Sequence, residues 1–238
     1  MTRPIIFSGP SLLPEDRSDS RFDFRAPARQ GDIIRAALEK PMAIGLIDGF
    51  FGSVQSVHQK EIIEALSQGI PVYGAASMGA LRAAELAPYG MIGVGGIFDD
   101  FQSGKLDADA DVAIAHGPAE LGFVATSVSM VDVRATIEAL GQDGAFGSAD
   151  LRVILDQAAR LHFTECTWEY IAQACAAVGV MSFDIAGVLK ARHVQRKRSD
   201  ALMLLDRLKT AIDPLRNRPT LPESAAYHEI RRRALKEV

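Results

Sequence analysis

The stretch Ile70-Pro-Val-Tyr-Gly-Ala-Ala-Ser-Met-Gly-Ala-Leu-Arg-Ala-Ala-Glu-Leu86 joins a short β-like run to a helical pattern through a single serine, Ser77. Small residues on both sides of such a serine let the chain turn sharply, and the hydroxyl then lies at the carboxyl edge of a sheet beside helix N–H groups. The pattern therefore predicts a nucleophile elbow. Its match to the hydrolase pattern G-x-S-x-G is incomplete, because Ala75 occupies the first glycine position. A serine that only caps a helix has a similar local sequence.

The alternation of strand and helix extends over the first half of the chain. Apolar runs stopped by turn residues are typical of buried parallel strands, and the capping pair Ser56 and Gln59 predicts the start of a helix. The expected strands lie at residues 4–8, 42–47 and 71–73, and the expected helices at 32–39, 56–69 and 77–88. Short connections between such elements predict an α/β fold with a mostly parallel sheet and flanking helices. Residues 14–29 are expected to form a long, mobile loop, and residues 90–96 a glycine-rich turn.

The C-terminal part of the sequence, after residue 130, has a helical pattern throughout. Its expected helices lie at residues 131–140, 149–162, 167–178, 184–212 and 222–237. We therefore expect two domains, an α/β core over residues 1–128 and a helical C-terminal region over residues 129–238.

Charge is divided unevenly along the sequence. Residues 1–188 carry 13 Lys and Arg against 24 Asp and Glu, whereas residues 189–238 carry 13 against 6. Such a basic tail can bind nucleic acid, an acidic partner or the protein's own acidic body. We expect it to dock on an acidic surface of a partner enzyme or of a second subunit, and not to reach Ser77.

The composition predicts a globular protein that needs no cross-links. With 238 residues, 48% of them hydrophobic, the chain is long enough to bury a substantial core. No run approaches the roughly 18 apolar residues that span a bilayer, and the apolar part of the N-terminus is too short for a signal peptide. The expected location is therefore the cytoplasm, and no association with a membrane is expected.

The sequence predicts no metal site and no cofactor. The acidic stretch 107–111 lacks the glycine and the glutamate of an EF-hand, so a solvated loop is expected there. The glycines of 90–96 match neither a dinucleotide fingerprint nor a Walker loop. Cys166 and Cys175 lie nine positions apart in one expected helix, on opposite faces of it, and lack the spacing of a zinc site. Buried, reduced thiols are expected.

A serine nucleophile needs a base within hydrogen-bond reach, and the candidates near the same sheet edge are Lys60, His58 and His116. With Ser56 as the cap, Lys60 is an early helical residue, where the helix dipole disfavours an ammonium ion and favours a base. Spacing alone favours a surface lysine paired with Glu64. His116 follows the apolar run 112–115, an expected strand, and a catalytic role for it also requires a placed carboxylate, for which Asp48 and Asp99 are candidates.

Other polar groups are expected around the serine. The N–H groups of Met78 and Gly79 begin the following helix and are candidates to bind an oxyanion. Arg82 either binds a carboxylate terminus or pairs with Glu85, three residues on. His58 either orients the substrate or the lysine, or is a partly buried histidine with a structural hydrogen bond.

Asp48 is a further candidate for substrate binding. It follows a predicted buried strand, and ligands of open α/β sheets bind at the carboxyl ends of the strands. Capping of the Asp-Gly-Phe turn is the alternative.

Four segments together resemble the core of the TfuA-like family. They are His58-Gln-Lys-Glu-Ile62, Gly74–Leu86, Tyr89-Gly-Met-Ile-Gly-Val94 and Asp111-Val-Ala-Ile-Ala-His116, within a resemblance that covers roughly residues 4 to 140. The resemblance implies a partner of YcaO enzymes in peptide backbone thioamidation. It also implies a serine–lysine pair, here Ser77 and Lys60, that hydrolyses the C-terminal thiocarboxylate of a ubiquitin-like sulfur-carrier protein and releases sulfide. The sequence departs from the family pattern at one place: the family typically has Asp-Asp-Glu before Val-Ala, and this chain has Asp109-Ala-Asp111.

Two functions of different classes follow. The first is a hydrolase in which Lys60 deprotonates Ser77. The alternative is a non-catalytic docking module that brings the YcaO enzyme and its peptide substrate together. The oligomeric state is left open for both functions, with a homo-oligomer as one alternative. Nucleic-acid binding through the basic runs 196–198 and 231–233 is not favoured, because the same expected helices carry leucines suited to packing.

Overall fold

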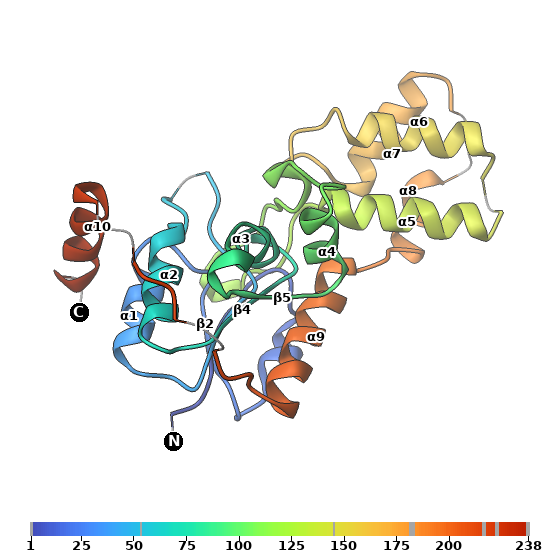
Figure 1. Cartoon of the computed structure of the whole chain (residues 1–238). Helices are drawn as coiled ribbons and strands as arrows, with labels where there is room; N and C mark the ends of the chain where they lie inside the picture. The colour runs from blue at the N-terminus through green and yellow to red at the C-terminus, as the bar shows by residue number, and fades with distance from the viewer. Residues whose placement is uncertain are drawn as a thin grey trace. The chain divides into compact units, whose positions relative to one another are not determined.

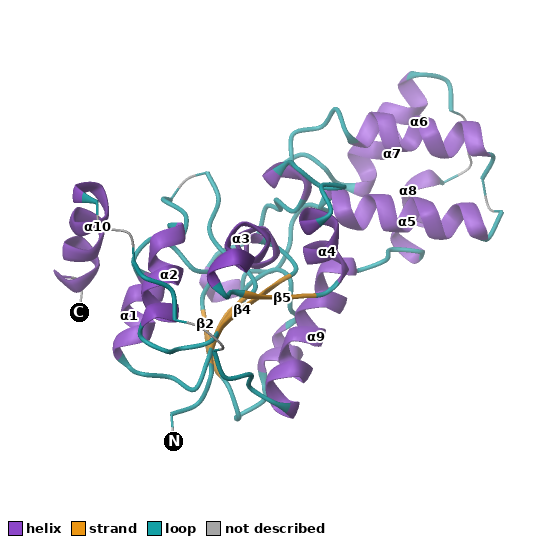
Figure 2. Ribbon diagram, in the orientation of Figure 1, coloured by secondary structure: helices purple, strands orange, loops and turns teal. Residues whose placement is uncertain are grey.

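In the part of the chain that the computed structural model describes, five short strands form a parallel sheet in the order β2-β1-β3-β4-β5 (Figures 1 and 2). The strands are β1 (Ile5–Phe7), β2 (Asp23–Arg25), β3 (Ile44–Leu46), β4 (Val72–Ala75) and β5 (Ile92–Val94). The described residues are 2–52, 54–144, 146–180, 184–215, 218–221 and 224–236. The predicted α/β fold with a parallel sheet is confirmed.

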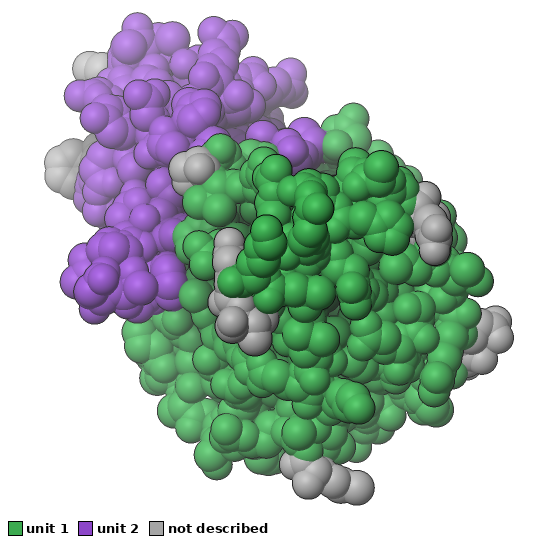
Figure 3. All heavy atoms as spheres, turned by 90° about the vertical axis from the view of Figure 1, so that its left-hand side faces the viewer, with its two compact units in different colours: residues 1–107, 198–238 green, residues 108–197 purple. Residues whose placement is uncertain are grey.

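Two compact units divide the chain, one of residues 1–107 and 198–238 and one of residues 108–197 (Figure 3). The first contains the sheet with α1 (Asp32–Leu38), α2 (Gln59–Ser67), α3 (Met78–Leu86), α4 (Gly96–Gln102), most of α9 (Arg196–Thr210) and α10 (Ala225–Lys236). The second contains α5 (Met130–Gln142), α6 (Ser148–Ala158), α7 (Trp168–Ala177) and α8 (Ile185–Ala191). Short 3₁₀ segments are η1 (Pro14–Arg17), η2 (Ala87–Tyr89), η3 (Asp109–Asp111) and η4 (Ala119–Leu121). The expected boundary after residue 128 differs from this division.

The two faces of the sheet are covered by different helices. Successive strand residues point to opposite faces, so Ile5 and Phe7 pack into one apolar cluster with residues of α1 and α2. Ile6 packs into a second cluster, whose other members include four residues of α9. Those four are Ala201, Leu204, Leu205 and Leu208, all nearly inaccessible to solvent. Helix α9 is therefore a core element of the first unit, although its sequence is rich in basic residues.

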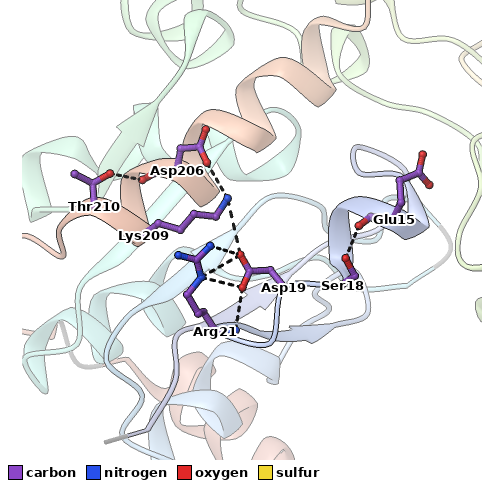
Figure 4. A network of polar contacts seen from close by, with 7 residues as sticks. All are labelled: Glu15, Ser18, Asp19, Arg21, Asp206, Lys209 and Thr210. Carbon is purple, nitrogen blue, oxygen red and sulfur yellow. Dashed lines mark hydrogen bonds and ion pairs between the residues drawn. The ribbon is translucent and has the colours of Figure 1, made fainter.

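The basic groups of α9 pair with acidic groups of the same unit. Arg198 forms a bidentate ion pair with Asp16 of η1, at 2.7 and 2.8 Å. Further along α9, the ammonium group of Lys209 lies between Asp206 and Asp19 (Figure 4). These pairs and the buried leucines favour the alternative in which this part of the tail binds the protein's own acidic body. Docking of the tail on a partner stays a prediction.

Several predicted elements differ in detail from those observed. Residues 14–29 contain η1 and β2, and the glycine-rich segment 90–96 contains β5. The expected helix 184–212 is two helices, α8 and α9. Residues 112–115 form no strand. Cys166 precedes α7, but both thiols are buried and free as expected, and burial raises the pKa of Cys166 to about 11.

Helix α3 lies so close to the sheet that Gly74 and Gly79 have no room for a side chain. A Cβ atom added to Gly79 would lie 1.8 Å from the carbonyl oxygen of Leu46 in β3. One added to Gly74 would lie 2.1 Å from the carbonyl oxygen of Gly79. Both clashes are with backbone atoms, which cannot rotate away. The small residues of the elbow therefore allow α3 to pack directly against β3 and β4.

Gly79→Ala is expected to lower the free energy of unfolding by about 3 kcal/mol or more, because the helix must move away from β3. Urea titration followed by circular dichroism measures this change. Gly117→Ala is the matched control, since its added Cβ meets nothing closer than 3.7 Å. It is expected to change stability by less than about 1 kcal/mol. Equal effects of the two variants would contradict the close packing of α3.

Candidate functional site

Ser77 lies at the sharp turn between β4 and α3, and its exposed fraction is 8%. Ala76 has a φ of 67°, a left-handed conformation that is uncommon for residues other than glycine. The N–H of Ser77 donates to the carbonyl oxygen of Ala75 at 2.8 Å, which closes a three-residue γ-type turn. The chain therefore stores backbone strain next to the serine, as strained turns at functional sites commonly do.

The Ser77 hydroxyl does not cap α3. Ser77 is the residue that precedes the helix, yet its side chain makes no capping hydrogen bond to the first turn. The interpretation of Ser77 as a helix-capping side chain is therefore wrong.

Only one of the two predicted oxyanion donors is available. The N–H of Gly79 donates to the carbonyl oxygen of Ile47 at 3.2 Å, because α3 lies so close to the end of β3. The N–H of Met78 has no acceptor among the described residues. This hydrogen bond favours Met78 over Gly79 as the oxyanion donor, and both roles stay predictions.

Helix α2 begins beside His58, and its cap differs from the predicted pair of Ser56 and Gln59. His58 Nδ1 accepts a hydrogen bond from the N–H of Lys60 at 3.1 Å, and Glu61 accepts one from the N–H of His58 at 3.0 Å. Lys60 is thus the second residue of the helix. Burial, together with the charges of Lys60 and Arg82, lowers the pKa of His58, which suits its role as an acceptor. The structural alternative for His58 is observed.

The Lys60 ammonium group reaches the C-terminal segment. Its Nζ donates to the Oγ of Ser224, just before α10, at 2.9 Å. The acidic neighbour expected for Lys60, Glu64, instead binds Tyr227 and Arg231 of α10. The prediction of a Lys60–Glu64 surface pair is wrong, and the C-terminal segment contacts the proposed base. The expectation that the tail does not reach Ser77 stays a prediction.

Arg82 ties α3 to the start of α2. Its guanidinium group pairs with Glu85 at 2.7 Å, and its Nε donates to the carbonyl oxygen of Val57 at 3.1 Å. Glu85 also accepts a hydrogen bond from Gln59 at 3.2 Å. Of the two alternatives for Arg82, the pair with Glu85 is the one observed. These contacts join the helix that follows Ser77 to the helix that carries Lys60.

Asp48 holds the loop after β1. Its carboxylate accepts from the N–H of Gly9 at 2.8 Å and from both the N–H and the hydroxyl of Ser11, at 3.1 and 2.7 Å. Only 2% of Asp48 is exposed. The group therefore organises the carboxyl edge of the sheet, and its hydrogen bonds to substrate stay a prediction.

His116 belongs to the second unit, residues 108–197. Its Nδ1 lies 2.8 Å from the carbonyl oxygen of Gly117, and the residue forms an isolated bridge with Ala125. His116 therefore lies in a small local turn, not at the end of the expected strand.

A family model described as TfuA-like protein matches residues 48–167, half of the chain. The matched region includes Ser77, Lys60 and the other predicted site residues. The chain belongs to the TfuA-like family. No curated protein matches it. Membership of this family supports an accessory role in thioamidation, associated with a YcaO-type enzyme.

The described residues of this TfuA-like protein contain no cluster of three His, Cys, Asp or Glu side chains suited to a metal ion. They also include no helix with the length and apolar character needed to cross a membrane.

Glu61 is a buried acidic residue that the sequence analysis did not single out. It is fully inaccessible, and its two carboxylate oxygens accept hydrogen bonds from the N–H groups of Gly31 and His58. Burial raises its pKa from 4.5 to about 7. The sequence signal for Glu61 is its position three residues after the capping residue His58, whereas the pattern Ser56 and Gln59 predicts a different capping pair. Glu61 joins α1 to the start of α2.

Glu61 is expected to make this TfuA-like protein less stable as the pH rises from about 4.5 to about 7. Over this range the folded state holds a proton that the unfolded state has lost, so the free energy of unfolding falls, by up to about 3 kcal/mol. Glu61→Gln, which has no proton to lose, is expected to remove this part of the slope. Urea midpoints at pH 5 and pH 8 for both proteins measure it. Parallel profiles would contradict the shifted pKa.

Proposed function

We propose that this TfuA-like protein hydrolyses the C-terminal thiocarboxylate of a ubiquitin-like sulfur-carrier protein and releases sulfide for a YcaO-type enzyme. In this proposal Ser77 is the nucleophile and Lys60 the base. The observation that carries it is the geometry of Ser77: a strained turn places it at the carboxyl edge of the sheet, and its hydroxyl is not used as a helix cap.

The first step forms an ester. The Ser77 oxygen attacks the thiocarboxylate carbon while Lys60 accepts the hydroxyl proton. As the C–S bond breaks, this proton passes to sulfur, which leaves as hydrosulfide. Negative charge on the tetrahedral intermediate is stabilised by the N–H of Met78 at the start of α3.

The second step restores the serine. Water, deprotonated by Lys60, attacks the ester carbon, and the C–O bond to Ser77 breaks with return of the proton to its oxygen. The carrier leaves with an ordinary carboxylate, so the sum is thiocarboxylate plus water giving carboxylate and hydrogen sulfide. No redox step or cofactor is required.

Incubation of the purified protein with a thiocarboxylated carrier, with quantification of released sulfide, tests the proposal. We expect many equivalents of sulfide per protein, and none from the same carrier with an ordinary carboxylate terminus. Release no faster than in the absence of protein would contradict the hydrolase and leave the docking module as the function.

A further inference from the structure

The C-terminal helix α10 is packed firmly on the first unit. Figure 1 shows it beside α1 and α2. Tyr227 and Ala234 are 2% and 3% exposed and form an apolar cluster with Ile34 of α1. The carbonyl oxygen of Ala234 also accepts a hydrogen bond from Arg35 at 3.3 Å. Helix α10 is thus part of the folded body.

Glu64 of α2 anchors this helix by two polar contacts. Its Oε2 accepts a 2.5 Å hydrogen bond from the hydroxyl of Tyr227, and its Oε1 pairs with Nε of Arg231 at 2.9 Å. Glu64 is 5% exposed and its contact with Tyr227 is buried, whereas the Arg231 side chain remains 43% exposed. Burial and the nearby carboxylate raise the pKa of Tyr227, which keeps its hydroxyl protonated as a donor. These contacts fix the start of α10 relative to α2.

Ser224 connects this anchored helix to Lys60. Its hydroxyl oxygen accepts from Lys60 Nζ at 2.9 Å and from the N–H of Tyr227 at 3.3 Å. A hydroxyl oxygen has two lone pairs, so it can accept both bonds at once. The lysine chain has four rotatable bonds and a large rotamer entropy, which a fixed acceptor reduces. A neutral lysine amine has two N–H donors and one lone pair, so donation of one N–H to Ser224 leaves the lone pair that the proposed base needs.

We propose that Ser224 is a positioning residue for Lys60, and this inference rests on the proposed Ser77–Lys60 reaction. Ser224 does not touch the substrate. It places the Lys60 nitrogen, and α10 places Ser224. The charged and titratable groups on the elements around Lys60 include His58, Glu61 and Glu64 on α2 and at its cap, Asp32 and Arg35 on α1, Arg82 and Glu85 on α3, and Tyr227 and Arg231 on α10. Helix α10 also carries His228, Glu229, Arg232, Arg233 and Lys236.

Sulfide release by Ser224→Ala tests the inference. We expect kcat to fall about 10- to 100-fold, the loss that a displaced catalytic group causes, with KM within about twofold of the wild type. Ser224→Thr, which keeps the hydroxyl, is expected to recover most of the rate. Ser67→Ala, at the other end of α2, is the control for a lost serine hydroxyl and should be fully active. Unfolding midpoints are compared for all variants. An unchanged or higher rate for Ser224→Ala would overturn the inference.

Acylation of Ser77 by p-nitrophenyl acetate separates this inference from the proposed substrate. Nitrophenol release and the mass of the acetylated peptide give its rate without any carrier. Slower acylation in Ser224→Ala, restored in Ser224→Thr, supports positioning even if thiocarboxylate is not the substrate. Equal acylation of wild type and Ser224→Ala overturns positioning whatever the carrier assay gives. If wild-type Ser77 is neither acylated nor needed for sulfide release, both proposals fail.

Discussion

Ser77→Ala is expected to abolish sulfide release, with kcat lower by a factor of about a thousand or more. The variant loses the atom that forms the ester, and water has no comparable position from which to attack. Alanine already occupies the two preceding positions of the turn, and the hydroxyl does not cap α3. The free energy of unfolding should therefore change by less than about 1 kcal/mol. Steady-state sulfide release and urea titration measure the two effects.

Ser56→Ala is the matched control for this variant. Ser56 lies in the loop before α2, where the sequence predicts a cap, but the cap is formed by His58. We expect wild-type kinetics from it. Full activity of Ser77→Ala would remove the covalent mechanism, and carrier binding without turnover by either form would favour the docking module.

Lys60→Met is expected to lower the rate at neutral pH by about 10²- to 10⁴-fold, the usual contribution of a general base. Methionine nearly preserves the length of the lysine side chain and removes its amine. Binding of the carrier, measured by titration calorimetry, should change much less than kcat. Lys105→Met, at a surface lysine, serves as the control for the loss of one positive charge.

His58→Asn tests the competing base. Asparagine is a good N-cap, so this variant keeps a cap on α2 while it removes the imidazole. We expect a small change in rate. A greater loss from His58→Asn than from Lys60→Met would assign the base to the histidine.

The sequence predicted the centre of the sheet better than its edges. Strands β1, β3 and β4 are almost entirely buried, and each has the continuous apolar run that burial requires. Strands β2 and β5 lie at the two edges of the sheet and are only partly buried, so a polar or glycine-rich sequence can form them. Edge strands carry weaker sequence signals for this reason.

The site was predicted only where it depends on local sequence. The turn at Ser77 follows from adjacent small residues. The fate of the Gly79 N–H depends on the approach of α3 to β3, which no local pattern encodes. The contact between Lys60 and Ser224 joins residues 164 positions apart.

Net charge alone does not identify what the basic tail contacts. A net positive segment predicts an acidic contact surface, but its charge does not say whether that surface belongs to another protein or to the same chain. Here Arg198 of α9 forms an ion pair with Asp16, and Arg231 of α10 forms one with Glu64 of the same chain. The leucines between the charges of α9 were the better indication of packing.

The intact mass of an acid-quenched reaction between the wild-type protein and the thiocarboxylated carrier tests directly for an ester on Ser77. We expect a covalent adduct with the summed mass of the two proteins less one hydrogen sulfide. Peptide mapping should locate the ester on Ser77, and Ser77→Ala should give no adduct. Sulfide release by Ser77→Ala at the wild-type rate, or an adduct that persists in that variant on another residue, would contradict the central claim.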